Sequence, residues 1–129
     1  MRKFVQFMIE ALGIDLIEVN RIKKALEKWG KRFLERVYTP KELAYCLKKR
    51  YPEGSLAGRF AAKEAVMKAL GTGLSSGVSW KDIEIVNNKK GKPEVFLCGK
   101  TKRILGKGKI LISISHTKED AIAQAIVIK

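Results

Sequence analysis

A run of small and apolar residues between positions 56 and 70, LAGRFAAKEAVMKAL, limits the fold of this chain more than any other segment. It follows the turn-forming sequence YPEGS, where Ser55 can cap a helix, and it stops at Gly71. The spacing predicts a helix with a stripe of alanines on one face. The stripe consists of Ala61, Ala65 and Ala69. Such a stripe permits close approach of a second backbone or of a ligand, and either use remains open at this point.

The residues before this helix predict one strand and several shorter helices. Residues 12–17 (LGIDLI) are typical of a buried strand, which is interrupted by the acid Asp15. Residues 19–29 carry apolar side chains at helical spacing and end at Gly30. A short helical piece is expected over 31–38. Another helix is expected to run to about position 50 from a capping box, which is formed by Thr39, Pro40 and Glu42.

The residues after the helix predict strands. We expect strands at 82–86 and 94–97, a short basic helix near 99–105, and a hairpin of 109–115 with 121–128 whose turn starts at His116. Strand, helices and then mostly antiparallel strands make the fold class α+β. With 129 residues, 46% apolar and 31% charged, the chain is expected to be one globular domain over residues 1–129.

Several classes of protein are disfavoured by simple counts. The apolar runs fall short of the roughly 20 residues that span a bilayer, and the first 15 residues lack a signal-peptide pattern, so we expect a cytoplasmic protein with no membrane partner. Cys46 and Cys98 lie far apart and the chain has one histidine, so the sequence encodes neither a zinc site nor a disulfide framework. We interpret both cysteines as small, partly buried thiols.

The formal net charge of +14 indicates an anionic partner. Nucleic acid, a phosphorylated small molecule, an acidic protein and a membrane surface are all compatible with it. Lysines strung along turns can equally serve solubility alone. Charge by itself therefore does not choose the function.

Glu64 is the most informative charged residue of the central helix. It is flanked by Lys63 and shares a helical face with Lys68, which in isolation would be an ordinary surface ion pair. Asp15 in its apolar strand supplies a second carboxylate, and two carboxylates from different elements suit Mg²⁺, which fills its other positions with water and phosphate oxygens. Lys68, the 71–77 loop and His116 at the hairpin turn, beside Ser113 and Ser115, could then hold a pyrophosphate. The pattern predicts magnesium-dependent phosphoryl-group transfer.

Three segments are similar to the signature segments of the holo-acyl-carrier-protein synthases, the short class of 4'-phosphopantetheinyl transferases. They are GIDLIEVNRI (13–22), AGRFAAKEAVMKALGTG (57–73) and ISISHTKEDAIAQAIV (112–127). The similarity extends over 32–43 and 82–93. Ala11 departs from the family's usual glycine, and residues up to about Phe7 resemble an extra N-terminal lead.

The resemblance implies a small antiparallel α+β fold and the transfer of phosphopantetheine from coenzyme A to a serine of apo acyl carrier protein. It implies that Asp15 and Glu64 bind Mg²⁺ and that Lys68 contacts a phosphate. The nucleotide end would be held by His116, Thr117 and the loop from Gly71 to Gly73. A metal-bound water, Glu64 or His116 could take the serine proton. Together with Lys68, which contacts the phosphate, the expected catalytic residues are Glu64, Lys68 and His116.

The resemblance also implies partners. The surface that meets the acidic carrier protein would comprise Arg21, Arg32, Phe33 and Arg36. The family has a longer class of two fused halves, so a chain of this length is expected to form a homotrimer with active sites at subunit boundaries. The alternative is a small basic nucleic-acid-binding module without catalysis; no recognised RNA- or DNA-binding motif supports it, and we expect no nucleic-acid partner.

Overall fold

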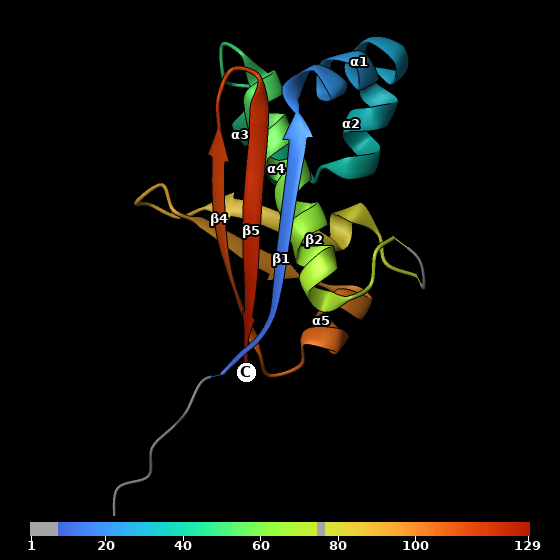
Figure 1. Ribbon diagram of the computed structural model, residues 1–129. Helices are drawn as coiled ribbons and strands as arrows, with labels where there is room; N and C mark the ends of the chain where they lie inside the picture. Colours follow the sequence, from blue (N-terminus) through green and yellow to red (C-terminus); the bar gives the residue numbers. More distant parts are fainter. Residues whose placement is uncertain (1–7, 75–76) are drawn as a thin grey trace, which may run out of the picture.

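A three-stranded antiparallel sheet lies against one long helix at the centre of the molecule (Figure 1). The strands are β1 (Ile9–Glu18), β5 (Asp120–Ile128) and β4 (Lys109–His116), in the order β1-β5-β4. The helix is α4 (Pro52–Leu70). The structure is a computed structural model that describes residues 8–74 and 77–129; the expected N-terminal lead, up to about Phe7, lies outside the described residues.

The predicted C-terminal hairpin is confirmed. Strands β4 and β5 pair antiparallel with His116 opposite Ala121, so the turn follows His116 as expected. On β5 every second residue from Ala121 to Val127 is buried against α4. Small side chains at these positions let the helix lie close to the sheet.

Strand β1 is an edge strand with one buried face. Among the described strands it pairs with β5 alone, and Leu12, Ile14 and Leu16 are 59%, 55% and 64% exposed. The prediction of a buried strand is therefore wrong for these three residues. Side chains alternate between the two faces of a strand, so Gly13, Asp15 and Ile17 point toward α4 and the apolar residues between them point away.

Gly13 is the point at which β1 comes closest to α4. A Cβ atom at this position would overlap the carbonyl oxygen of Ala65 and lie 2.8 Å from the amide nitrogen of Ala69. The alanine stripe of the helix is therefore used for contact with a second backbone. This close approach carries Asp15, two residues further along the same face of β1, to the side of the helix.

Helix α4 begins earlier than predicted. It starts at Pro52, not after a cap at Ser55, because proline has the backbone angle of a first helical residue and needs no hydrogen bond there. It ends at Leu70, and Gly71 adopts the left-handed conformation with φ 73°. The predicted stop is confirmed.

Three helices follow β1 in the order expected. They are α1 (Val19–Trp29), α2 (Lys31–Val37) and α3 (Pro40–Cys46). The capping box of Thr39 and Glu42 is confirmed, with Pro40 at the first helical position. Helix α3 ends at Cys46, short of the predicted position 50. The bounds of α1 and α2 agree with the prediction to within one residue.

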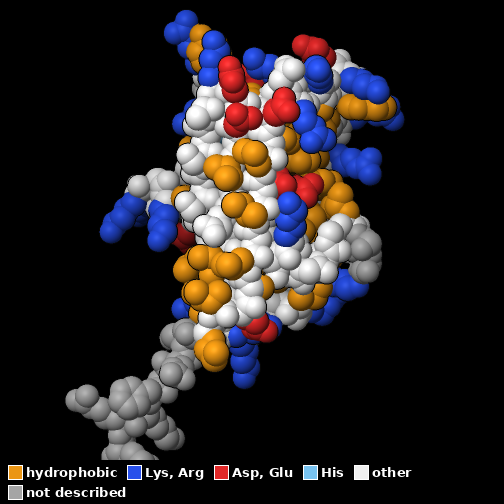
Figure 2. Space-filling model, viewed as in Figure 1, with side chains coloured by type: hydrophobic (Ala, Val, Ile, Leu, Met, Phe, Trp, Pro, Cys, Tyr) orange, Lys and Arg blue, Asp and Glu red, His pale blue; other side chains and the backbone are white. Residues whose placement is uncertain are grey.

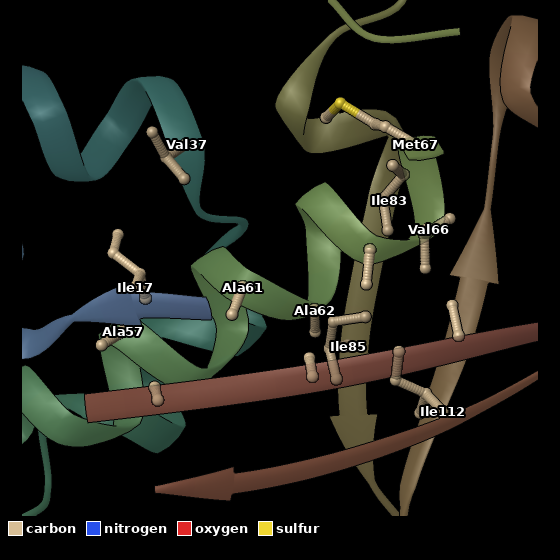
Figure 3. Packing of buried hydrophobic residues seen from close by; sticks show 14 of the residues in the cluster. Ile17, Val37, Ala57, Ala61, Ala62, Val66, Met67, Ile83, Ile85 and Ile112 are labelled. Carbon is tan, nitrogen blue, oxygen red and sulfur yellow. The ribbon is translucent and has the colours of Figure 1, made fainter. Parts of the chain in front are cut away.

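A two-stranded antiparallel sheet packs on the other side of α4. It consists of β2 (Ile83–Asn87) and β3 (Pro93–Leu97), and it is flanked by the short helix η1 (Trp80–Asp82) and by α5 (Gly99–Leu105). Ile83 and Ile85 meet Ala62 and Val66 of α4 in the core (Figure 3). All strand pairs are antiparallel, which confirms the predicted α+β class.

The two thiols differ in burial. Cys46 is buried in the core and Cys98 is exposed, which corrects the prediction of two partly buried residues; both are free. No helix of residues 8–74 and 77–129 is both long enough and apolar enough to cross a membrane.

Candidate active site

Three charged side chains meet where β1 passes α4. Lys68 Nζ lies 3.2 Å from Asp15 Oδ1 and donates a hydrogen bond to the carbonyl oxygen of Ile14 at 2.9 Å. Glu64 lies one helical turn before Lys68 on the same face of α4. The Asp15 side chain is 16% exposed and that of Lys68 is 54% exposed, so the cluster opens to solvent on the lysine side.

The charge of Asp15 acts on the carboxyl group of Glu64. Partial burial and the nearby charge of Asp15 raise the pKa of the Glu64 carboxyl above its ordinary value, and Lys68 and Arg21 oppose this shift. The two acids are therefore close enough to repel each other. A site that holds two like charges together favours the binding of a cation.

The donor set fits a hard divalent cation. Asp15 and Glu64 supply carboxylate oxygens, the ligands that Mg²⁺ prefers, and among the residues that the structure describes no histidine or cysteine joins them in a metal-binding group. Within the described part of the chain, no group of three or more His, Cys, Asp and Glu residues could hold a metal ion by protein ligands alone. A cation bound at this pair would therefore complete its coordination with water or with substrate oxygens, as Mg²⁺ commonly does.

Lys63 does not belong to this cluster, although it precedes Glu64 in the sequence. Its side chain is fully buried on the other side of α4, with Nζ 2.6 Å from Glu42 Oε1. Nζ also donates to three backbone carbonyl oxygens, which are those of Val37, Trp80 and Ile83. The expectation that Glu64 lies between two ammonium groups is wrong, because adjacent residues of a helix point in different directions.

His116 and Thr117 form part of a second cluster. They line a groove of about 600 Å³ together with the start of α4. Its other lining residues are Val19, Lys23, Tyr51, Glu53, Gly54 and Lys118. A Cβ atom at Gly54 would lie 3.3 Å from His116 Nδ1, so the first turn of α4 packs directly on the histidine.

The two clusters stand apart within one chain. Asp15 is aligned with Ile114 across β5, and His116 lies two residues further along β4. Because β4 is the second strand from β1, the backbones of Asp15 and His116 are on the order of 12 Å apart. Along α4, Gly54 and Glu64 are separated by ten residues, or about 15 Å. The chain therefore brings Asp15, Glu64 and Lys68 together but leaves His116 and Thr117 outside hydrogen-bonding reach of them.

Gly71 and Gly73 lie beyond the other end of α4. Both have positive φ, 73° and 60°, and both are exposed with no neighbouring atom within 4 Å of a notional Cβ. Such backbone can turn its amide groups toward a phosphate. The expected 71–77 loop is described only in part, because positions 75 and 76 lie outside the described residues.

A basic groove of about 550 Å³ lies at the junction of α1 and α2. It is lined by Trp29, Arg32, Phe33 and Arg36. Trp29, the last of the apolar residues expected to pack along 19–29, is 52% exposed and lines this groove instead of the core. Arg21 is also exposed, but it lines a different groove beside Leu16 and Lys118, nearer the carboxylate pair.

Arg59 has site-like properties that the sequence reasoning missed. It is only 5% exposed, and no carboxylate of the described residues forms an ion pair with it. Its guanidinium lies 4.1 Å from the centre of the Tyr45 ring, Nη2 donates to Asn87 Oδ1, and Nε has no hydrogen-bond partner. An arginine inside an otherwise small and apolar helical segment was the available signal.

Known proteins resemble this chain over nearly its whole length. Residues 11–124 match the 4'-phosphopantetheinyl transferase superfamily. A holo-[acyl-carrier-protein] synthase of Protochlamydia amoebophila is 50% identical over 119 residues, which cover 92% of this chain and 98% of the relative.

Solved structures agree with the sequence relatives. A holo-(acyl-carrier-protein) synthase from Bacillus anthracis, solved in complex with CoA (3',5'-ADP), has a TM-score of 0.81 and 40% identity, over 95% of this chain and 98% of that one. The holo-[acyl-carrier-protein] synthase of Neisseria meningitidis has a TM-score of 0.84 and 35% identity, over 95% and 100% of the two chains.

Proposed function

The chain belongs to the 4'-phosphopantetheinyl transferase superfamily, and we propose that Asp15 and Glu64 form the cation site at which it works. The enzyme transfers the 4'-phosphopantetheine group of coenzyme A to a serine hydroxyl of apo acyl carrier protein. The products are holo acyl carrier protein and adenosine 3',5'-bisphosphate. The relatives described above are all named holo-acyl-carrier-protein synthases, so the nucleic-acid alternative finds no support.

The convergence of Asp15, Glu64 and Lys68 carries this proposal. The two carboxylates would hold Mg²⁺, which when bound supplies charge neutralisation at a phosphate. Lys68 is half exposed at the open side of the pair, so its ammonium can bind a phosphate oxygen of coenzyme A by charge-assisted hydrogen bonds. Both features stabilise negative charge on the phosphate that departs with the nucleotide.

Residues outside this cluster would orient the remainder of the substrate. His116 and Thr117 line a groove large enough for part of a nucleotide, and Gly71 with Gly73 offers exposed backbone beyond the other end of α4. Without a cation, burial and the charge of Asp15 raise the pKa of Glu64, and a bound Mg²⁺ would oppose this shift. Glu64, a bound water and His116 are the three candidates for receiving the serine proton.

The outer face of the sheet supports the proposed homotrimer. Leu12, Ile14 and Leu16 of β1 and Leu111 and Ile122 of β4 and β5 are exposed. Figure 2 shows hydrophobic side chains gathered over this face. An uncovered apolar face favours association. A second subunit could bring its His116 groove to the carboxylate pair of the first, which the single chain does not do. Light scattering that gives a fully active monomer would refute this assembly.

The basic groove of α1 and α2 supports the proposed carrier surface. Arg32 and Arg36 flank the partly buried Phe33 and the exposed ring of Trp29, so an acidic helix would find both charge and apolar contact. Arg21, nearer the carboxylates, would contact the carrier close to the reacting serine. Arg36→Glu should raise the KM for carrier protein and leave the affinity for coenzyme A unchanged. An unchanged KM for carrier protein with weaker binding of coenzyme A would show that the groove does not bind the carrier.

One assay tests the central proposal. Purified enzyme, coenzyme A and an apo acyl carrier protein should give a magnesium-dependent mass increase of one phosphopantetheine group on the carrier. Asp15→Asn and Glu64→Gln each remove a charged oxygen with little change of shape, and each should lower turnover by two or more orders of magnitude, on the order of 3 kcal/mol. Glu10→Gln, which removes a carboxylate charge from an exposed pair with Lys129, is a matched control and should leave turnover unchanged. A residue whose replacement left turnover intact would not be a metal ligand.

The physiological setting follows from the same proposal. Acyl carrier proteins charged in this way would serve fatty acid biosynthesis in the cytoplasm. That setting stays a prediction, which the location of the tagged protein in the cell and the state of its carrier protein after depletion of the enzyme would test.

A further inference from the structure

Lys68 occupies one of the carboxylate oxygens that a cation would need. Its Nζ lies 3.2 Å from Asp15 Oδ1 and 2.9 Å from the carbonyl oxygen of Ile14. Among the described residues, this is the one ion pair in which Asp15 takes part. The ammonium therefore neutralises Asp15 from within the chain.

A divalent cation at the same carboxylate would meet this ammonium at close range. The cation and the ammonium would share an acceptor, and their like charges would repel each other across a few ångströms. Glu64 does not relieve the competition, because Lys68 acts on its charge as well. Binding of the cation is therefore opposed for as long as Lys68 remains at Asp15.

The side chain of Lys68 can move away from Asp15. Lys68 is 54% exposed, its four-carbon stem is flexible, and its two acceptors lie at the edge of the cluster. A phosphate group beside α4 offers the ammonium several charged oxygens in place of one carboxylate oxygen. The exchange of partners would free Asp15 at the moment when the substrate arrives.

We propose that Lys68 is an internal competitor of the divalent cation at Asp15, and that a substrate pyrophosphate draws it away. This inference rests on the proposed function, since it takes Asp15 and Glu64 as the cation ligands. Its consequence is that the cation and coenzyme A bind with a positive coupling of which Lys68 carries a part. Coupling of this kind is reciprocal, so each ligand raises the affinity for the other by the same factor.

Calorimetry on the whole protein, with no carrier protein present, measures this coupling without catalysis. Mg²⁺ is titrated into the free protein, and coenzyme A is titrated with and without saturating Mg²⁺. Lys68→Met should bind Mg²⁺ about two- to five-fold more tightly than the wild type, since exposed ion pairs contribute up to about 1 kcal/mol. The factor by which Mg²⁺ strengthens coenzyme A binding should fall by the same amount.

Two further variants separate local competition from general charge. Lys68→Arg keeps the cation and should keep the weaker Mg²⁺ affinity of the wild type. Lys31→Met removes the same charge from an exposed pair with Glu35 on α2 and should leave Mg²⁺ affinity unchanged. If Lys31→Met strengthened Mg²⁺ binding as much as Lys68→Met, the effect would be one of net charge and the inference would fail.

The outcomes also separate this inference from the proposed function. Equal or weaker Mg²⁺ binding by Lys68→Met, with Asp15→Asn still defective in Mg²⁺ binding, would overturn the competition alone. Mg²⁺ binding that Asp15→Asn left unchanged would overturn the ligand assignment, and the inference with it.

Discussion

Helix α4 carries two lysines five residues apart, and each pairs with a carboxylate from another element. The side chains of Lys63 and Glu42 are both fully buried, with Nζ 2.6 Å from Oε1, and the ammonium also donates hydrogen bonds to three backbone carbonyl oxygens. Lys68 and Asp15 are 3.2 Å apart, and the lysine is half exposed. A lysine–carboxylate pair thus occurs once within the core and once at the candidate site.

The two ion pairs differ in their exposure to solvent and in the number of their other partners. Lys63 has lost its water, and burial lowers its pKa while Glu42 opposes that change, so the pair has no alternative partners. Glu42 is also engaged by the backbone amides of Thr39 and Ile85. Lys68 keeps access to solvent and can exchange its partner at little cost. Burial, more than charge or spacing, therefore decides whether an ion pair is structural or can take part in binding.

The largest expected effect comes from breaking the buried pair. Lys63→Met leaves the charge of Glu42 unpaired in the core and removes the donor to three carbonyl groups, so the free energy of unfolding should fall by about 3–5 kcal/mol. Urea unfolding followed by circular dichroism measures the loss.

A double variant tests whether the pair itself is responsible. Glu42→Gln combined with Lys63→Met removes both charges, and its loss should be smaller than the sum of the two single losses by about 1 kcal/mol or more. Strict additivity would show that the two residues act independently and would break the contrast with Lys68.

The exposed pair should behave in the opposite way. Lys68→Met should change the free energy of unfolding by less than about 1 kcal/mol, because an open ion pair gains little from its mutual attraction. Turnover should nevertheless fall by about 100-fold, since a phosphate contact is lost. The two measurements are unfolding in urea and the carrier mass-shift rate. A loss of stability as large as that of Lys63→Met would contradict the division between the two pairs.

The smallest expected effect concerns Glu64. Its pKa is raised in the folded protein, so the folded form loses stability as pH rises and the carboxyl ionises. Glu64→Gln resembles the protonated form, and in chelator at pH 7 it should raise Tm by about 1–3 °C. The difference should shrink as pH falls below about 4, because the wild-type carboxyl then becomes protonated in the unfolded state as well. A variant less stable than wild type at pH 7 would show that Lys68 and Arg21 outweigh Asp15.

Local signals in the sequence predicted most of the elements. The capping box of Thr39 and Glu42, the stop at Gly71 and the hairpin turn at His116 each depend on a few neighbouring residues, and all three are confirmed. The start of α4 was misplaced because Pro52 was interpreted as a break, although proline is equally suited to a first helical turn.

Contacts between distant residues were not available from spacing. The sequence showed that Leu12, Ile14 and Leu16 are apolar, but their exposure follows from the register in which Gly13 faces Ala65. Burial of Glu42 against Lys63, 21 positions later, and of Arg59 under Tyr45 likewise depends on packing between elements. Propensities and caps act over about four residues, whereas these contacts join segments 14 or more residues apart.

The pattern of elements along the chain predicted the α+β class, and the resemblance of three segments predicted the family, which the family match over residues 11–124 confirms. The same segments predicted Asp15, Glu64 and Lys68 as a site, and the structure brings these three side chains together. Three features became visible in the folded chain alone: Lys68 and not Lys63 lies beside Asp15, His116 lies apart from the two carboxylates within one chain, and one face of the sheet is exposed. The reason is physical: spacing places a side chain on a face of its own element, but its charge state, solvent and partners are set by the elements that pack against that face.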